Sequence, residues 1–254
     1  MEQYKVTKYP DGQISVTFNE YKYWIHKRIT SYEDIFILKS ISDVYKHNRW
    51  YLPNVFIPCL FGQQSDRRFN ENESFDLKNI AEVINSCKFP RIEILDPHSD
   101  ISLALINNSI ARLPIGYIRL AVTDIGNITG DNPVLISPDA GAYKKVFKFA
   151  QELNFPLVPA NKYRDRQGNI TLEVSGNVKG LNCLICDDIA VGARTFVELG
   201  KKLKELGANK VFLYVSHGHF TKGFGELRDN VDHVYCTNSV KDIVDDFVTQ
   251  YKVI

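Results

Sequence analysis

Short apolar runs alternate with amphipathic helical segments in the second half of the sequence, and this pattern constrains the fold more than any other feature. Residues 133–137 (PVLIS), 181–186 (LNCLIC) and 211–215 (VFLYV) each have the length and composition of a buried strand. Residues 140–153 and 195–206 place their apolar side chains at helical spacing between these strands. Strands and helices in this order form parallel sheets with right-handed crossovers. The sequence therefore predicts an α/β fold.

The first half is less regular but has the same ingredients. Residues 14–18 alternate as a half-buried strand does, and the apolar residues 35–38 have the pattern of a buried strand. Residues 76–87 carry apolar side chains at helical spacing and precede an expected strand at residues 92–95. These segments predict a second, smaller α/β unit. The stretch 43–58 is short for a helix between the two strands expected on either side of it.

The boundary between the two units is expected within residues 114–131. Pro114-Ile115-Gly116 and a loop from Gly126 to Gly130 mark this segment as a connection. We therefore predict one domain from residue 1 to 116 and a second from residue 117 to 254.

Composition excludes several classes of function. The 254 residues are 44% hydrophobic and 24% charged, and the formal net charge is +1. A charge so near zero gives no overall attraction to nucleic acid. No apolar run approaches the 18 residues of a membrane span, and the first 12 residues lack the apolar core of a signal peptide. The five cysteines, an odd number, favour reduced thiols. We expect a cytoplasmic protein that binds neither nucleic acid nor membrane.

The pair Cys183 and Cys186 has the spacing of a redox or zinc motif, but its context favours a structural role. Both cysteines belong to the apolar segment 181–186. On a strand, residues three apart point to opposite faces, and no second cysteine or histidine pair completes a zinc site. The sequence predicts two buried thiols on opposite faces of a sheet.

The segment 186–195 (CDDIAVGART) has the features of a phosphate-binding loop. It connects an expected strand to an expected helix, and the start of a helix binds anions through its unpaired N–H groups and its dipole. Gly192 and Ala193 allow close approach of the backbone, and Thr195 can cap the helix or hold a phosphate oxygen. Asp187 and Asp188, at the carboxyl end of the strand, can accept hydrogen bonds from two vicinal sugar hydroxyls. The alternative is that these side chains only cap a helix.

An ordered series of motifs makes a family resemblance specific. The loop at 186–195 resembles the PRPP-binding loop of phosphoribosyltransferases and of ribose-phosphate pyrophosphokinases (PRPP synthetases). Other segments resemble the pyrophosphokinases in particular, in the order in which that family has them, across roughly residues 9–220. They are Tyr9-Pro10-Asp11-Gly12-Gln13, Ile57-Pro58, Gln64-Ser65-Asp66-Arg67-Arg68, Leu95-Asp96-Pro97-His98, Ile136-Ser137-Pro138-Asp139-Ala140-Gly141, Asn161-Lys162-Tyr163-Arg164 and Tyr214-Val215-Ser216-His217-Gly218.

The resemblance implies two tandem phosphoribosyltransferase-like (Rossmann-like) units with mainly parallel sheets. It also implies a reaction in which the anomeric hydroxyl of a ribose 5-phosphate attacks the β-phosphorus of Mg-ATP and AMP leaves. Lys162 and Arg164 would be catalytic, because positive charge stabilises a pyrophosphoryl group in transit. Composition alone assigns the polar stretch around them to a solvated loop.

The resemblance also implies binding roles and a homodimer or larger homo-oligomer. Mg²⁺ would be held by His98 and Asp139, although a histidine after a strand is more often a turn residue. The ATP positions are Asp11, Gln13, Gln64, Ser65 and Arg67, the first two reaching in from a neighbouring subunit. The ribose phosphate positions are Asp187, Asp188, Val191, Gly192, Ala193, Arg194 and Thr195.

Three departures in the loop bear on the acceptor. Val191 stands where the family has an aspartate, Gly192 where it has a threonine, and Arg194 where it has a glycine. An added arginine beside an open turn suits a 5′-phosphate that continues as a diphosphate. The loop resembles that of short, phage-type relatives that pyrophosphorylate ADP-ribose for NAD synthesis, and we expect ADP-ribose to be the acceptor. Arg194 can instead pair with Glu198, four residues on.

Other functions remain open at this point. The chain can be a PRPP synthetase acting on free ribose 5-phosphate, or a non-catalytic regulatory paralogue, because Gln13, Gln64 and Ser65 also replace family residues at the ATP positions. A phosphoribosyltransferase is a further alternative, which the motifs of the first half disfavour.

Overall fold

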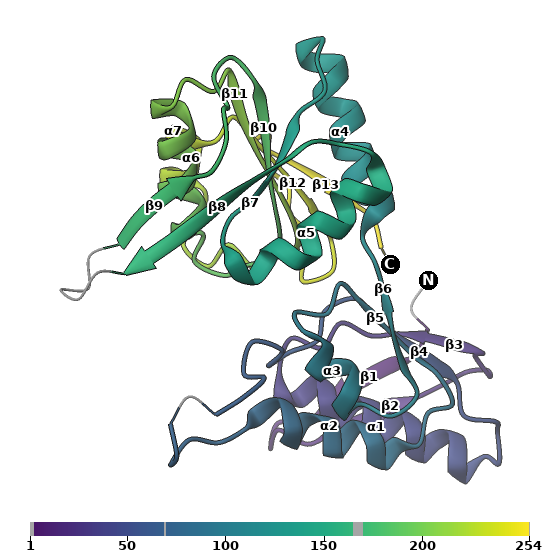
Figure 1. Cartoon of the computed structure of the whole chain (residues 1–254). Coiled ribbons are helices and arrows are strands. Elements are labelled where there is room, and N and C mark those ends of the chain that lie inside the picture. Colours follow the sequence, from purple (N-terminus) through teal and green to yellow (C-terminus); the bar gives the residue numbers. More distant parts are fainter. Residues whose placement is uncertain (1–2, 69, 165–169, 254) are drawn as a thin grey trace. The chain divides into compact units, whose positions relative to one another are not determined.

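The computed structural model of the chain divides into two compact units between Leu113 and Pro114 (Figure 1). It describes residues 3–68, 70–164 and 170–253, and for residues 162–164, 170 and 171 it describes the backbone. We call the part before Pro114 unit 1 and the rest unit 2.

Unit 1 contains a parallel sheet whose strand order follows the chain. Each strand pairs with the next one along the sequence, in the order β3-β4-β5-β6. A separate antiparallel hairpin, β1-β2, precedes the sheet. The strands are β1 (Lys5–Lys8), β2 (Ile14–Thr17), β3 (Trp24–His26), β4 (Asn54–Ile57), β5 (Ile92–Leu95) and β6 (Ser109–Arg112).

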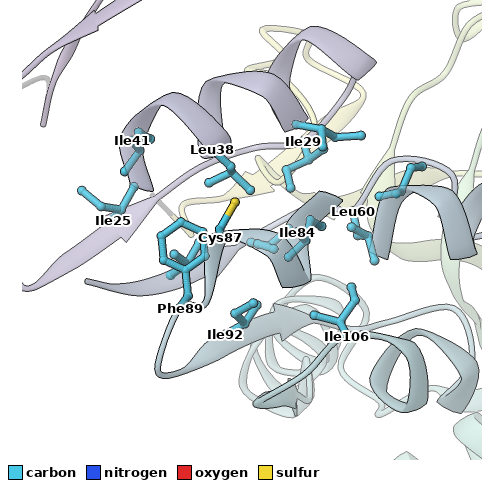
Figure 2. Packing of buried hydrophobic residues seen from close by; sticks show 14 of the residues in the cluster. Ile25, Ile29, Leu38, Ile41, Leu60, Ile84, Cys87, Phe89, Ile92 and Ile106 are labelled. Atoms are coloured by element: carbon cyan, nitrogen blue, oxygen red, sulfur yellow. The ribbon is translucent and has the colours of Figure 1, made fainter. Parts of the chain in front are cut away.

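Helices α1 (Tyr32–His47), α2 (Asp76–Cys87) and α3 (Asp100–Leu105) form the crossovers between consecutive strands. Strands wound in one direction place right-handed crossovers on one face of the sheet. The core of unit 1 accordingly lies between the sheet and α1 and α2, as Figure 2 shows for ten of its members. These are Ile25, Ile29, Leu38, Ile41, Leu60, Ile84, Cys87, Phe89, Ile92 and Ile106.

The prediction of a strand at residues 35–38 is wrong, because these residues lie in helix α1. Ser31 begins the helix and its side chain accepts a hydrogen bond from the backbone N–H of Asp34. The buried residues of α1 include Ile35, Leu38 and Ile41, which have helical spacing. The stretch 43–58 is expected to be short for a helix between two strands. This expectation is also wrong, because the helix occupies residues 32–47, where a strand is predicted. The other three predicted elements of the first half, at 14–18, 76–87 and 92–95, are confirmed.

Unit 2 is built on a seven-stranded sheet with the order β13-β12-β11-β10-β7-β8-β9. All neighbours are parallel except β8 and β9, which form an antiparallel hairpin. The order reverses between β7 and β10, as in doubly wound folds. The strands are β7 (Val134–Ser137), β8 (Leu157–Arg164), β9 (Ile170–Val174), β10 (Asn182–Ala190), β11 (Lys210–Gly218), β12 (His233–Thr237) and β13 (Val248–Tyr251).

Helices cover both faces of this sheet. On one face α4 (Ile115–Thr129) and α5 (Ala140–Leu153) bury apolar side chains, and on the other α6 (Arg194–Glu205) and α7 (Gly225–Asn230) do so. The strands and helices predicted for the second half are confirmed as elements. Cys183 packs in the core under α6 and α7, whereas Cys186 packs in the core under α4 and α5. Both are free and buried, which confirms the structural interpretation.

The segment 114–131 is a helix rather than a connecting loop. α4 starts after Pro114 and ends at Gly130, whose positive φ of 84° is the left-handed conformation that often closes a helix. Ile118, Ala121 and Ile125 are buried against the sheet of unit 2. The two glycines at 126 and 130 therefore do not bound a loop, and the expected loop there is wrong. In the described residues no helix is long and apolar enough to cross a membrane.

Candidate functional site

The carboxyl ends of β7 and β10 meet where the strand order of unit 2 reverses. In doubly wound sheets, ligands bind at this edge. β10 pairs with β7 only as far as Ile185 with Ile136, but it continues beside β11 as far as Ala190. The last residues of β10, including Asp187 and Asp188, therefore extend past the paired part of β7. The sequence predicts these aspartates at the strand end, and the structure places them within the strand.

Asp139 follows β7 directly and begins helix α5. Its Oδ1 accepts a hydrogen bond from the backbone N–H of Ala142 at 2.9 Å. The hydroxyl of Ser137 donates to the carbonyl oxygen of Asp139, also at 2.9 Å. These two bonds fix the carboxylate at the edge of the sheet.

Asp187 and Asp188 form a close carboxylate pair. The backbone N–H of Asp188 donates to Asp187 Oδ1 at 2.9 Å, and Asp188 is only 4% exposed. Burial, the charge of Asp188 and the more distant charge of Asp139 raise the pKa of Asp187 well above its usual value. Lys145 Nζ on α5 lies 3.6 Å from Asp188 Oδ1. The pair thus offers carboxylate oxygens that can accept hydrogen bonds from hydroxyl groups.

The loop after β10 is held from one side by the segment that follows β11. The carbonyl oxygen of Ala190 accepts the N–H groups of His219 and Phe220, at 2.9 and 3.1 Å. The carbonyl oxygen of Val191 accepts both the N–H and the hydroxyl of Thr221, at 2.8 and 3.0 Å. The loop carbonyls are therefore turned to structural partners.

Helix α6 begins without a side-chain cap. The residue that flanks its start is Ala193, in a left-handed conformation with φ 58°, and the alanine side chain makes no capping hydrogen bond. One of the two roles predicted for Thr195 is to cap this helix. Thr195 does not cap it, because it lies inside the helix. Uncapped N–H groups and the helix dipole together favour an anion at this end. Gly192 has room around it, because an added Cβ would meet only Lys222 Cε at 3.9 Å.

Arg194 points along its own helix. Its Nε donates to Glu198 Oε1 at 2.8 Å, and the arginine side chain is 77% exposed. This is the pairing that the sequence offers as an alternative to a phosphate contact. An exposed i,i+4 pair is worth roughly 0.3–0.5 kcal/mol, so a phosphate can displace it.

The residues predicted as catalytic lie on the β8–β9 hairpin. Lys162 pairs with Leu172 and Arg164 with Ile170 in the antiparallel register. Their backbone is therefore strand, whereas composition alone predicts a loop. Their side chains lie outside the described part of the chain.

The predicted ATP residues of unit 1 lie in two turns. Asp11 and Gln13 are exposed at the turn of the β1–β2 hairpin, where the backbone N–H of Gln13 donates to Asp11 Oδ1 at 3.0 Å. Gln64 and Arg67 are exposed after β4, and Ser65 is partly buried between them. Exposure on turns leaves these side chains accessible to a nucleotide.

His98, one of the two predicted metal ligands, follows β5. Its backbone N–H donates to Oε1 of Gln63 at 3.1 Å, and Gln63 is 2% exposed. No group of three or more metal-ligating side chains forms among the residues that the structure describes. Sequence reasoning missed Gln63 and Lys145. Their signals are weak, because a glutamine in a turn and a lysine in a helix are both ordinary surface residues.

Fold and site together define a doubly wound α/β protein with a strand–loop–helix, uncapped at the start of the helix, at the point of strand reversal. The chain matches the phosphoribosyl transferase domain family over residues 108–253, more than half of its length. It belongs to that family. It is also related to ribose-phosphate pyrophosphokinases at about 28% identity.

Two of these relatives give the extent of the similarity. The pyrophosphokinase of Thermosipho africanus is 28% identical over 190 residues, which are 73% of this chain and 60% of that protein. The pyrophosphokinase of Listeria ivanovii is 28% identical over 221 residues, 84% of this chain and 69% of that protein. The chain thus spans about two thirds of the length of the relatives it matches.

The fold extends to both units. The crystal structure of phosphoribosylpyrophosphate synthetase from Mycobacterium smegmatis superposes with a TM-score of 0.82 at 20% identity, covering 98% of this chain and 86% of that chain. The predicted fold class, two phosphoribosyltransferase-like units with mainly parallel sheets, is confirmed.

Proposed function

We propose that the protein is an ATP-dependent pyrophosphokinase. It transfers the β,γ-pyrophosphoryl group of ATP to the anomeric hydroxyl of a ribose 5-phosphate moiety and releases AMP. The observation that carries this proposal is the carboxyl edge of β7 and β10. There, Asp187 and Asp188 offer acceptors for a sugar diol beside the uncapped start of α6, which suits the sugar phosphate. Kinship with ribose-phosphate pyrophosphokinases supports the same reaction.

The donor set of the chain fits Mg²⁺ in part. Asp139 offers a carboxylate at the sheet edge of unit 2, the hard oxygen ligand that Mg²⁺ prefers. His98, at the sheet edge of unit 1, offers an imidazole. Mg²⁺ binds few protein groups beside substrate phosphates, so each of these residues would contribute a single ligand to an ion held mainly by the triphosphate, where the ion would neutralise phosphate charge.

ADP-ribose is the acceptor that we propose, and its support is the chemistry of the loop. Val191 contributes no carboxylate, Gly192 leaves space, and Arg194 is a fixed cation beside them. A charged hydrogen bond from Arg194 to a second phosphate would contribute roughly 1.5–3 kcal/mol, or about one to two decades of preference. That exceeds the value of the exposed pair with Glu198.

The deciding experiment incubates the protein with ATP and either ribose 5-phosphate or ADP-ribose and measures AMP. We expect AMP to form only when an acceptor and a divalent ion are present, and excess chelator to stop it. Absence of AMP with both acceptors would favour the non-catalytic alternative. Undiminished AMP formation in chelator would contradict the role of Mg²⁺.

The acceptor is tested by comparing kcat/KM for the two sugars in the native protein and in Arg194→Gly. We expect ADP-ribose to be preferred and the variant to lose about one to two decades of that preference. Glu198→Gln is the matched control, since it releases Arg194 without removing its charge. If the native protein prefers ribose 5-phosphate, it is a PRPP synthetase. If Arg194→Gly leaves the preference unchanged, the proposed contact is wrong.

A further inference from the structure

A lysine that the sequence does not single out lies against the carboxylate pair. Lys145 stands on the second turn of α5, and its Nζ lies 3.6 Å from Asp188 Oδ1. The lysine side chain is 21% exposed and the aspartate side chain 5% exposed. Neighbouring lysines of the same helix, Lys144 and Lys148, are exposed. Lys145 therefore belongs to the site, whereas Lys148 belongs to the solvated face.

The charges at this edge of the sheet explain why a cation is needed here. Asp188 and Asp139 both act electrostatically on Asp187. A phosphorylated sugar brings further negative charge to the same edge. A buried carboxylate beside other carboxylates is costly unless it is paired with a cation. Lys145 supplies positive charge against Asp188 from within the protein.

We propose that Lys145 is a positioning residue for the acceptor. It holds the Asp188 carboxylate in the orientation in which it accepts a hydrogen bond from one hydroxyl of the ribose diol. This inference rests on the proposed function, because it takes the diol to be the ligand of Asp187 and Asp188. Lys145 acts through Asp188 and makes no contact with the transferred group.

The architecture favours this indirect role. The next residue of α5, Val146, is fully buried in the core between the helix and the sheet, and this holds Lys145 in place. Its ammonium group therefore approaches Asp188 from the layer of helices that covers this face. The start of α6, which is the proposed anion site, packs on the opposite face of the sheet.

The test measures the dissociation constants of ribose 5-phosphate and ADP-ribose by calorimetry, without ATP, so that it does not depend on catalysis. We expect Lys145→Met to weaken binding of both sugars about tenfold, and Lys145→Arg to restore most of the affinity. Lys148→Met, which removes the same charge from the exposed face of the same helix, should bind as the native protein does. In the AMP assay, Lys145→Met should raise KM for the acceptor and leave KM for ATP nearly unchanged.

The double variant with Asp188→Asn separates action through Asp188 from direct contact. If Lys145 acts through Asp188, Lys145→Met should add little to the loss already caused by Asp188→Asn. Unchanged affinity in Lys145→Met overturns the inference, and so does an equal loss from Lys145→Met in the two backgrounds. If the native protein binds the sugars and Lys145→Met weakens that binding, but no AMP forms, the proposed reaction is wrong and the role of Lys145 is supported. A native protein that binds neither sugar refutes both.

Discussion

The carboxyl edges of the two parallel sheets are built differently. In unit 2, the edge carries the carboxylates of Asp139, Asp187 and Asp188 and the uncapped start of α6. In unit 1, three polar residues after β4 and β5 are buried, namely Gln63, Asp66 and Asp96, and Gln63 Oε1 accepts the backbone N–H of His98. The first edge offers hydrogen-bonding groups to a ligand. The second uses the Gln63 side chain to hold the turn after β5.

This difference assigns different tasks to the two edges. An edge with an uncapped helix start and clustered carboxylates suits a phosphorylated diol. An edge whose turn is held by a buried glutamine can present a few groups beside it, such as the His98 imidazole and the exposed Gln64 and Arg67. We therefore expect substitutions in unit 2 to change acceptor affinity, and substitutions in the turns of unit 1 to change stability.

The largest expected effect is a loss of turnover, and it is expected on the β8–β9 hairpin rather than at either sheet edge. We expect Lys162→Ala and Arg164→Ala each to lower kcat by roughly three orders of magnitude. Their charges are required chiefly while the pyrophosphoryl group is in transit. Single-turnover AMP formation gives the rate, and calorimetry should show acceptor affinity close to that of the native protein.

Lys148→Ala, on the exposed face of α5, controls for loss of charge alone. Near-native turnover in both hairpin variants would show that these residues are not catalytic. Acceptor affinity lost in parallel with turnover would instead place them in the acceptor site.

How far the sequence predicts the structure also differs between the units. In unit 2, the three predicted strands are almost fully buried runs and the helices have broad apolar stripes, so the hydrophobic period and the segment length predict the same elements. In unit 1, Ile35-Phe36-Ile37-Leu38 is a continuous apolar run, and only the structure shows that Phe36 is 60% exposed while its neighbours are buried. Four apolar residues do not distinguish a strand from one turn of helix. The signal in the sequence that favours a helix here is Ser31, a residue type that often caps a helix start.

The candidate site shows a similar limit. The loop at 186–195 was recognisable because its residue types serve phosphate and diol binding in one short segment. Lys145 and Gln63 were not, because each acts on a residue 35 or more positions away in the chain. Such contacts depend on the sheet order, which the local pattern does not contain. The strand order of unit 2 was likewise visible only in the structure.

A matched pair of glycine substitutions tests the division of tasks directly. Gly62 has a φ of +75°, and a Cβ added there would lie 2.6 Å from Cδ1 of Ile80, which is buried. We expect Gly62→Ala to lower the free energy of unfolding by about 1–3 kcal/mol. Gly192 has no such φ and has open space, so Gly192→Ala should change stability by less than about 0.5 kcal/mol. Denaturant titration measures both.

The acceptor dissociation constant should respond in the opposite way. A methyl group on residue 192 narrows the proposed phosphate-binding loop at 186–195, and we expect the affinity for the acceptor to fall several-fold. Folded Gly62→Ala should bind the acceptor with native affinity. Reversed results, with affinity lost at residue 62 and stability lost at residue 192, would refute the assignment of tasks to the two edges.

The smallest expected effect concerns the amount by which the Asp187 carboxylate lowers the stability of unit 2. Burial and the charge of Asp188 raise the folded-state pKa of Asp187 above its unfolded value. The folded state then binds more protons than the unfolded state, so stability falls as pH rises from the unfolded pKa of about 3.9 through the folded pKa. Asp187→Asn removes this loss. We expect the variant to match the native protein near pH 4 and to exceed it by about 1 kcal/mol at pH 7, or about 2–4 °C in Tm.

Thermal melts between pH 4 and pH 8 measure this difference, and exposed Asp229→Asn is the control for removing a carboxylate from the surface of unit 2. The same Asp187→Asn variant should bind the acceptor more weakly, because an amide replaces a carboxylate that accepts a sugar hydroxyl. Gain of stability with loss of affinity is the behaviour of a residue kept for binding at a cost to folding. If the stability of the variant relative to the native protein is the same at pH 7 as at pH 4, the Asp187 carboxylate is not destabilising, and the proposed cost of this edge to the stability of unit 2 is wrong.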